Sequence, residues 1–315
     1  MDVSIVVPLF NEDESLPELC SWIERVVTEH KLSYEVILVD DGSTDNSWEF
    51  IDLKHKEDGH FKGIRFQRNY GKSAALNEGF KAAAGDVIIT MDADMQDSPD
   101  EIPGLYNMIR LEGYDMVSGW KKVRYDNTFT KNIPSKLYNA VARSSSGIQL
   151  HDFNCGLKAY RKKVVKSIEV YGEMHRYIPI LAKWSGFRRI GEKVVEHRPR
   201  KYGVTKFGWE RFVNGFLDLA TIMFLGKFGK KPMQFFGLLG TLFFLIGFLS
   251  SIYLVIAKIV TIDFALTNRP SFYIALTTMI IGMQLFLTGF VAEMVARNAP
   301  ERNSYLIESK LGLSE

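Results

Sequence analysis

Cysteine is scarce in this sequence of 315 residues, which contains only Cys20 and Cys155. Two cysteines are too few for a disulfide framework, and neither lies in the Cys-x-x-Cys spacing of a metal site, so a reducing compartment is expected. A large excess of one charge is also lacking, because 39 basic and 37 acidic residues leave a formal net charge of +2. The average charge therefore indicates no class of partner, although basic residues are concentrated between Arg176 and Lys231.

A basic leader with a cleavage site is absent from the N-terminal stretch MDVSIVVPLF, which is expected to be a first strand and not a signal peptide. The chain is 46% apolar and is longer than most single domains. One domain plus an attachment is therefore expected.

Short apolar runs alternate with helical patterns through the first third of the chain. This alternation predicts an α/β fold with a Rossmann-like, mostly parallel sheet that is covered on both faces. The polar clusters NED, DDGSTD and DADMQD each follow directly after an apolar run. Because ligands bind outside the carboxyl ends of parallel strands, we expect the three clusters to line one site.

Two long apolar segments, at about residues 235–259 and 272–296, are each long enough to cross a ~30 Å hydrocarbon core. They predict a transmembrane hairpin, since the rest of the chain is too small to cover both as core helices. Basic residues flank the hairpin, and the positive-inside rule then places both termini and the α/β part in the cytoplasm. Inside the second segment, Glu293 is expected to reach the interface or to pair with Arg297.

Residues 206–231 connect the α/β part to the first apolar segment. Phe212, Phe216 and Met223 share one helical face in this region, with basic residues at both ends. The pattern predicts a helix in the membrane interface, and packing on the soluble part is the alternative.

Asp92 and Asp94 follow the apolar run VIITM, two positions apart. If the chain stays extended, both carboxylates point the same way, and the small Ala93 between them leaves room for a ligand. With the amide oxygen of Gln96 they form a set of hard oxygen ligands that suits Mg²⁺ or Mn²⁺. The alternative, an acidic turn that leads into a helix, is favoured for Asp97.

Two other kinds of phosphate chemistry do not fit. A Walker A loop requires glycine where Phe66 stands, five residues before Gly71-Lys72-Ser73. An aspartyl phosphotransferase would be expected to carry Thr or Val in place of Gln96, and it would leave the motif VDDGSTD unexplained.

Several motifs occur together in one order: SIVVPLFNE, VDDGSTD, NYGKSAALNEG, DADMQD, HDFNCGLKAYRKKV and PRKYGVTKFG, followed by the hairpin. Over essentially its whole length the chain resembles the family 2 inverting glycosyltransferases of the GT-A fold. Within that family it resembles the polyprenyl-phosphate glycosyltransferases of the dolichol-phosphate mannosyltransferase and bactoprenol glucosyltransferase type. The resemblance implies a cytoplasmic GT-A domain over 1–205, an interfacial region over 206–231, two transmembrane helices over 232–297 and a cytoplasmic tail over 298–315.

The implied reaction moves a hexose from a nucleotide sugar, of UDP-glucose or GDP-mannose type, to undecaprenyl or dolichyl phosphate in the bacterial inner membrane. Mg²⁺ or Mn²⁺ is the implied cofactor, and it would neutralise the leaving diphosphate. A processive polysaccharide synthase is one alternative, although the Gln-x-x-Arg-Trp signature and the further spans of such enzymes are missing. A non-catalytic scaffold or flippase component is another. No nucleic-acid partner is expected, and glycine and threonine in the spans permit a homo-oligomer, a dimer or tetramer.

The resemblance also implies a role for each residue that matches a family motif. The residues implied to bind the nucleotide sugar are Pro8, Phe10, Glu12, Val39, Asp41, Lys72, Asp92, Ala93 and Asp94. Those implied to hold the metal are Asp92, Asp94 and Gln96, and those implied to bind the lipid phosphate are Lys121, Arg124, Lys131, Ser135, Arg200, Thr205 and Lys206. Lys121 stands where relatives often carry Arg, so the cation that meets the acceptor stays open.

The residues implied to be catalytic are Asp94, Asp152 and Arg200. Asp152 matches the position of a catalytic base, but a phosphate monoester is mostly dianionic at neutral pH and needs a base less than a hydroxyl does. Orientation of a sugar hydroxyl and structural capping therefore stay open for Asp152.

Overall fold

The computed structural model describes residues 1–122, 139, 142, 143, 146–198, 224, 228, 232–260, 265–298 and 307–312. The chain divides into two compact units. One consists of Met1–Leu219 with Asn303–Glu315, and the other of Ala220–Arg302.

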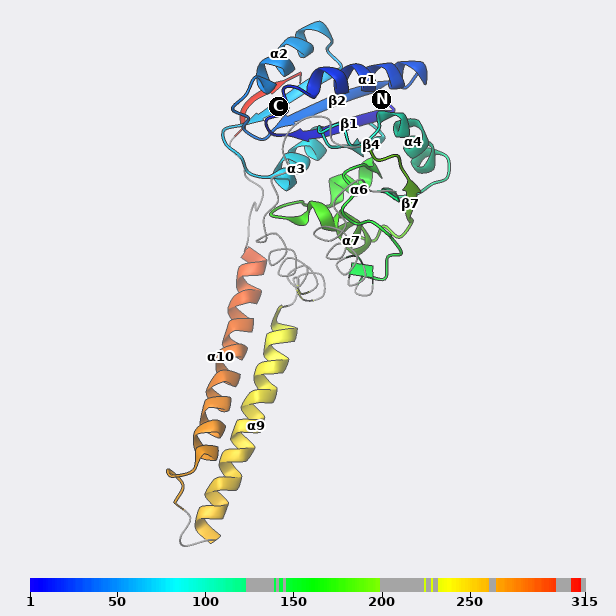
Figure 1. Ribbon diagram of the computed structural model, residues 1–315. Coiled ribbons are helices and arrows are strands. Elements are labelled where there is room, and N and C mark those ends of the chain that lie inside the picture. The colour runs from blue at the N-terminus through cyan, green and yellow to red at the C-terminus, as the bar shows by residue number, and fades with distance from the viewer. Residues whose placement is uncertain are drawn as a thin grey trace. The chain divides into compact units, whose positions relative to one another are not determined.

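The first unit is built on an eight-stranded sheet with the order β7-β5-β6-β4-β1-β2-β3-β8 (Figure 1). The strands are β1 (Val3–Leu9), β2 (Tyr34–Asp40), β3 (Phe61–Phe66), β4 (Val87–Thr90), β5 (Met116–Trp120), β6 (Lys158–Arg161), β7 (Ile190–Val194) and β8 (Ile307–Leu311). Strands β3, β2, β1 and β4 are parallel, whereas β6 is antiparallel to both β4 and β5. The α/β class and the parallel arrangement predicted for the first strands are confirmed.

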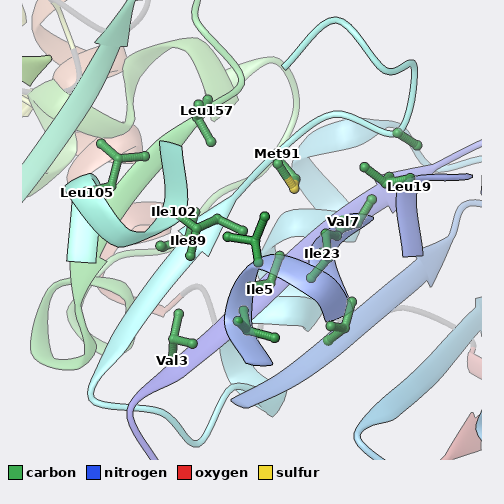
Figure 2. Packing of buried hydrophobic residues seen from close by; sticks show 14 of the residues in the cluster. Val3, Ile5, Val7, Leu19, Ile23, Ile89, Met91, Ile102, Leu105 and Leu157 are labelled. Carbon is green, nitrogen blue, oxygen red and sulfur yellow. The ribbon is translucent and has the colours of Figure 1, made fainter. Parts of the chain in front are cut away.

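Helices cover both faces of this sheet (Figure 1). The α-helices are α1 (Leu16–Glu29), α2 (Ser47–Glu57), α3 (Lys72–Ala82), α4 (Ile102–Arg110), α6 (Lys162–Ser167) and α7 (Ile178–Trp184), and the 3₁₀ helices are η1 (Pro99–Glu101) and η3 (Met174–Tyr177). The amphipathic α1 turns Leu19 and Ile23 toward Ile5 and Val7 of β1 in the core on one face (Figure 2). On the other face α3 packs closely, because a Cβ on Gly79 would lie 2.3 Å from Val6 Cγ1.

The C-terminal segment returns to the first unit, which the sequence analysis did not foresee. Strand β8 pairs antiparallel with the edge strand β3, with Lys310 opposite Ile64 and Leu311 opposite Gly63. Leu311 also packs against the hydrophobic core. Part of the expected tail over 298–315 is therefore a strand of the main sheet.

The second unit contains two long helices, α9 (Pro232–Val260) and α10 (Pro270–Asn298). Both contain 18-residue windows of high mean hydropathy, 2.3 and 1.9, and both are long and apolar enough to cross a membrane. Glycines let the two backbones approach, since a Cβ on Gly240 would lie 2.6 Å from the carbonyl oxygen of Gly282. The prediction of two long apolar helices that pair as a hairpin is confirmed.

Glu293 of α10 interacts with the first turn of α9. Its carboxylate accepts the backbone N–H of Met233 at 3.4 Å, one of the amides that a helix start leaves without a partner in its own helix. The predicted partner Arg297 has a side chain outside the described residues. The predicted interfacial region 206–231 also lies outside them, apart from Phe224 and Phe228.

Candidate active site

The clusters NED and DDGSTD interlock at the carboxyl ends of the neighbouring parallel strands β1 and β2. Asn11 donates its backbone N–H to Ser43 Oγ at 2.9 Å, and its side-chain oxygen accepts the N–H of Thr44 at 2.9 Å. Glu12 donates its N–H to Ser47 Oγ at 3.0 Å. Asn11 has a left-handed backbone, with φ of 57°, which turns the chain toward the second cluster. Two of the three predicted clusters therefore lie in direct contact.

Asp41 connects these clusters to the segment that precedes α3. Its carboxylate is 4% exposed and accepts the backbone N–H groups of Tyr70 at 2.7 Å and Gly71 at 2.9 Å. Burial raises the pKa of Asp41 to about 6, although these two hydrogen bonds favour the charged form. In the pairing of β1 with β2, which precede these two clusters, Pro8 lies opposite Val39.

Gly42 follows Asp41 at a point where no side chain fits. Its φ is +75°, and a Cβ would lie 2.6 Å from the carbonyl carbon of Arg68. The glycine of the motif DDGS therefore lets the chain pass close to the loop after β3. This close approach holds Tyr70 and Gly71 of that loop beside Asp41.

Lys72, the first residue of α3, joins the first two polar clusters to the third, DADMQD. Its ammonium donates a hydrogen bond to a carboxylate oxygen of Asp92. A continuous set of contacts therefore runs from Asp41, through Gly71 and Lys72, to Asp92. The prediction that all three clusters line one site is met by these contacts.

The loop that contains Asp92 and Asp94 differs from its predicted conformation. Strand β4 ends at Thr90, and residues 93 and 94 form a turn. The N–H of Gln96 donates to Asp94 Oδ1 at 3.2 Å, and Met95 has a left-handed φ of 61°. The assumption that the chain stays extended through Asp94 is therefore wrong, because local hydrogen bonding to the Asp94 side chain closes a turn.

Asp92 lies against a glycine and among cations. A Cβ on Gly156 would lie 2.5 Å from Asp92 Oδ2, so only glycine leaves the carboxylate its place. Burial alone would raise the pKa of Asp92, but Lys72, Lys121 and Lys158 outweigh burial and lower it to about 2. Asp92 is therefore ionised at any physiological pH.

These residues fit a divalent cation that the protein would hold through few ligands. Asp92 and Asp94 supply carboxylate oxygens, which hard cations prefer, and Gly156 leaves space beside Asp92. Within the described part of the chain, no cluster of three or more His, Cys, Asp or Glu side chains could hold a metal. Water and a ligand's phosphates would have to complete the coordination, as is usual for Mg²⁺.

Asp97 is a buried ion-pair partner and not a helix cap. It is 0% exposed, and its Oδ1 lies 2.7 Å from the ammonium of Lys121, whose side chain is 12% exposed. The residue at the N-cap of η1 is Ser98. Asp97 directly precedes Ser98 and η1, in agreement with the interpretation of an acidic turn that leads into a helix, and its ion pair with Lys121 was not foreseen.

Asp152 is buried, and its backbone N–H donates to the carboxylate of Glu192 at 3.2 Å. Its side chain is 1% exposed and accepts the N–H of Asn154 at 3.0 Å. The rings of Trp120 and His151 stack at 4.1 Å, and Glu192 binds His151 Nδ1 at 2.7 Å. The hydrogen bond to Asn154 matches the capping alternative for Asp152 and leaves the other two open.

His175 is a site residue that the sequence analysis missed. Its Nδ1 lies 3.0 Å from Ser73 Oγ, and its ring lines a small cavity together with Lys72 and Asn154. Burial, followed by the charges of Lys72, Arg176 and Lys158, lowers the pKa of His175 well below its usual range. His175 is therefore neutral at physiological pH. The segment MHRY carried no metal or nucleophile spacing that would have singled it out.

Several expected site residues fall outside the described residues. They are Arg124, Lys131, Ser135, Arg200, Thr205 and Lys206. Of the other expected residues, Pro8, Phe10 and Glu12 are half-buried, while Val39 and Ala93 are buried.

Comparison with known proteins identifies the family. Residues 4–169 match the model of glycosyl transferase family 2. The chain is 35% identical over 302 residues to the dodecaprenyl-phosphate galacturonate synthase of Rhizobium johnstonii. The matched region covers 94% of this chain and 88% of that protein. It is 36% identical over 297 residues to the undecaprenyl-phosphate 4-deoxy-4-formamido-L-arabinose transferase of Aeromonas hydrophila, with the same coverage of 94% and 88%.

The chain belongs to the polyprenyl-phosphate glycosyltransferases of family 2. Solved structures with similar folds support the GT-A fold of this glycosyltransferase. Glucosyl-3-phosphoglycerate synthase from Mycobacterium tuberculosis in complex with UDP has a TM-score of 0.53 and 16% identity, over 71% of this chain and 79% of that chain. The complex of the same synthase with Mn²⁺, UDP-glucose and phosphoglyceric acid has a TM-score of 0.52 and 19% identity, over 70% and 80%. At these identities the likeness shows the fold alone.

Proposed function

We propose that this glycosyltransferase moves a sugar from a nucleoside diphosphate donor to a polyprenyl monophosphate at the cytoplasmic face of the bacterial inner membrane. The observation that carries the proposal is the set of contacts from Asp41, through Gly71 and Lys72, to Asp92. The order of these groups, a buried carboxylate, a lysine and a second carboxylate, supports a site that would take a nucleoside, a diphosphate and a metal in turn.

The donor site would use the carboxyl ends of β1, β2 and β4. The nucleoside would lie against Pro8, Phe10 and Glu12, with Val39 and Asp41 at the base and ribose. Lys72 and the Asp92–Asp94 turn would then meet the diphosphate. This order follows the order of the strands, since β1 lies between β2 and β4.

A divalent cation, Mg²⁺ or Mn²⁺, held by Asp92, Asp94 and Gln96, would supply Lewis-acid stabilisation of the departing diphosphate. The chain itself contributes Lys72, whose ammonium binds Asp92 in this structure and would also meet a phosphate bound beside Asp92. His175, neutral and bonded to Ser73, would fix the start of α3 beside Lys72. Direct displacement with inversion needs no protein nucleophile, so the absence of a reactive cysteine is no obstacle: burial raises the pKa of Cys155 to about 12.

The acceptor phosphate would be bound by Arg124, Lys131, Ser135, Arg200, Thr205 and Lys206. Lys121 is left out of this set because its ammonium is paired with Asp97 and its side chain is only 12% exposed, whereas the side chain of Lys72 is 33% exposed. Because a polyprenyl chain stays in the bilayer, two spanning helices would hold the active site at the membrane surface. We propose that both termini are cytoplasmic, since basic residues flank the two spans.

The donor sugar is the least specified part of the proposal. UDP-glucose and GDP-mannose are candidates from the family resemblance. The names of the relatives add galacturonate and 4-deoxy-4-formamido-L-arabinose. The two relatives are named for different sugars, so the test uses a panel of nucleotide-sugar donors.

The test uses purified full-length protein in nanodiscs, undecaprenyl phosphate and a panel of UDP- and GDP-linked sugars, with mass spectrometry of the extracted lipid. We expect a polyprenyl monophosphate sugar that forms with Mg²⁺ or Mn²⁺ and not in EDTA. Asp94→Asn should abolish the product. A polymer would indicate a processive synthase, and transfer from no donor, or transfer that is unchanged in EDTA, would refute the proposal.

A further inference from the structure

Lys121 and Asp97 form an ion pair that is almost completely removed from water. Asp97 is 0% exposed, the Lys121 side chain is 12% exposed, and the charged atoms are 2.7 Å apart. Charged groups this deep are costly unless each has its partner. Burial disfavours the charged form of Lys121, but the Asp97 carboxylate outweighs burial and raises the pKa of Lys121 above its usual value. Lys121 therefore stays charged and stays bound to Asp97.

The second oxygen of Asp97 closes the loop that carries the proposed metal ligands. Asp97 Oδ2 accepts the backbone N–H of Asp92 at 3.3 Å. This hydrogen bond connects the two ends of the loop Asp92–Asp97. Lys121 directly follows β5, whereas Asp92 follows β4. The ion pair therefore fixes the Asp92–Asp97 loop to a second strand of the sheet.

The backbone of the same loop also holds the start of the basic segment HRPRKYGVTK. Asp97 pairs with His197 in an isolated antiparallel bridge, and Arg198 donates its N–H to the carbonyl of Gln96 at 3.1 Å. The Arg198 guanidinium lies 4.3 Å from the ring centre of Trp22 on α1. A displacement of Asp97 would therefore disturb both the proposed metal ligands and the first residues of the basic segment.

We propose that Lys121 is a positioning residue which acts through Asp97 to hold the Asp92–Gln96 loop ready for a divalent cation, and that it does not bind the lipid phosphate. The inference rests on the metal site of the proposed function. To reach Lys121, an acceptor phosphate would have to displace a carboxylate at 2.7 Å and enter a region that solvent barely reaches. The flanking Lys122 is exposed, and its ammonium lies 5.9 Å from the ring centre of Trp120.

Asp97→Asn separates the two roles because they predict opposite results. If Lys121 positions the loop, the loss of the carboxylate charge weakens cation binding and leaves lipid phosphate binding unchanged. If Lys121 binds the acceptor, the same change frees its ammonium and tightens lipid phosphate binding. Asparagine has nearly the same shape as aspartate, so this variant also serves if Lys121→Met fails to fold.

The experiment measures two ligands separately on the full chain in nanodiscs. Mn²⁺ binding is followed by electron paramagnetic resonance with UDP and, separately, with GDP, and farnesyl phosphate binding is measured in EDTA. We expect Lys121→Met and Asp97→Asn each to weaken Mn²⁺ binding at least tenfold and to change farnesyl phosphate binding less than twofold. The double variant should resemble either single variant, because both remove one interaction.

Lys62→Met is the matched control. Lys62 also forms a partly buried ion pair, 2.8 Å from Glu35, at the opposite end of the strands. It should lower thermal stability without an effect on either ligand. A tenfold loss of Mn²⁺ binding in this control would show that destabilisation alone accounts for the result, and would overturn the inference.

Hydrogen exchange of residues 91–98 gives a readout that does not depend on the metal. Both variants should increase exchange in this loop, because without the ion pair the side chain of residue 97, which accepts the Asp92 amide, is no longer held in place. If wild-type protein binds no Mn²⁺ with either nucleotide, the metal site of the proposed function is wrong, and exchange alone decides the positioning role. Unchanged exchange, or a loss of farnesyl phosphate binding in Lys121→Met with Mn²⁺ binding intact, would overturn the inference.

Discussion

Gly156 lies directly against the carboxylate of Asp92, where a Cβ would be 2.5 Å from Oδ2 and 2.6 Å from Cγ. The backbone of Gly156 is held in place, since its carbonyl accepts the hydroxyl of Thr90 at 2.9 Å. The carboxylate, and not the glycine, must therefore move if a methyl group is added. The motif NCG thus has a steric function beside the proposed metal site.

Gly156→Ala should lower the affinity for Mn²⁺ with UDP or GDP by about tenfold, because the methyl group displaces a proposed ligand. The added methyl should also cost about 1–3 kcal/mol of stability. Gly59→Ala is the control, because nothing lies within 4 Å of a Cβ at that position. Titration of Mn²⁺ into both variants checks the prediction. Unaltered Mn²⁺ affinity in Gly156→Ala would show that Asp92 does not hold the ion in the position seen here.

The pKa of Asp41 predicts a specific dependence of stability on pH. Burial raises it from the ordinary value of 3.8 to about 6, so the folded protein holds this proton more tightly than the unfolded chain does. Protonated Asp41 thus adds about 3 kcal/mol to the free energy of unfolding. This stabilisation is fully present below about pH 4 and is lost as the pH rises through about 6. In Asp41→Asn this loss of stability with rising pH should be absent, because asparagine does not titrate.

Measurement of the free energy of unfolding from pH 4 to 7 checks the sign for Asp41. Relative to Asp41→Asn, the wild-type protein should lose stability as the pH rises across this range. A constant difference between wild type and Asp41→Asn would contradict the prediction.

Asp152→Asn distinguishes chemistry from capping, because the asparagine oxygen can still accept the N–H of Asn154. We expect kcat to fall about 100-fold with an unchanged thermal midpoint, as for removal of a general base or of an orienting carboxylate. Asp152→Ala, which loses the hydrogen bond as well, should lower both kcat and the midpoint. If Asp152→Asn retains wild-type kcat, capping is its whole role.

The contacts that could be predicted are those between neighbouring parallel strands. Asn11 meets Ser43 because β1 and β2 are adjacent in both sequence and sheet, and their polar carboxyl ends had to coincide. The pair of Asp97 with Lys121 was not predictable, because β6 is inserted between β4 and β5 and the chain reaches it only later. The turn at Asp94 was missed for a different reason, since a side-chain hydrogen bond ended the strand before its apolar pattern did.

Strand β8 yields the last prediction, because it pairs with β3, which would otherwise be the edge strand at this end of the sheet. Edge strands expose unpaired N–H and C=O groups, which promote association between chains. Here Ile307–Leu311 pairs with β3, and Gly312 packs near His55, where a Cβ would lie 2.7 Å from the imidazole Cε1. A chain truncated after residue 306 should therefore expose β3.

The truncated chain should lose about 2–4 kcal/mol, since a few net hydrogen bonds of about 0.5–1.5 kcal/mol each disappear. Backbone amides of residues 61–66 should exchange faster, and the protein should aggregate more readily. A chain that ends at Gly312 retains β8 and is the control. Protection of 61–66 that survives the longer truncation would mean that β8 is not needed to cover this edge, and hydrogen exchange with mass spectrometry measures this directly.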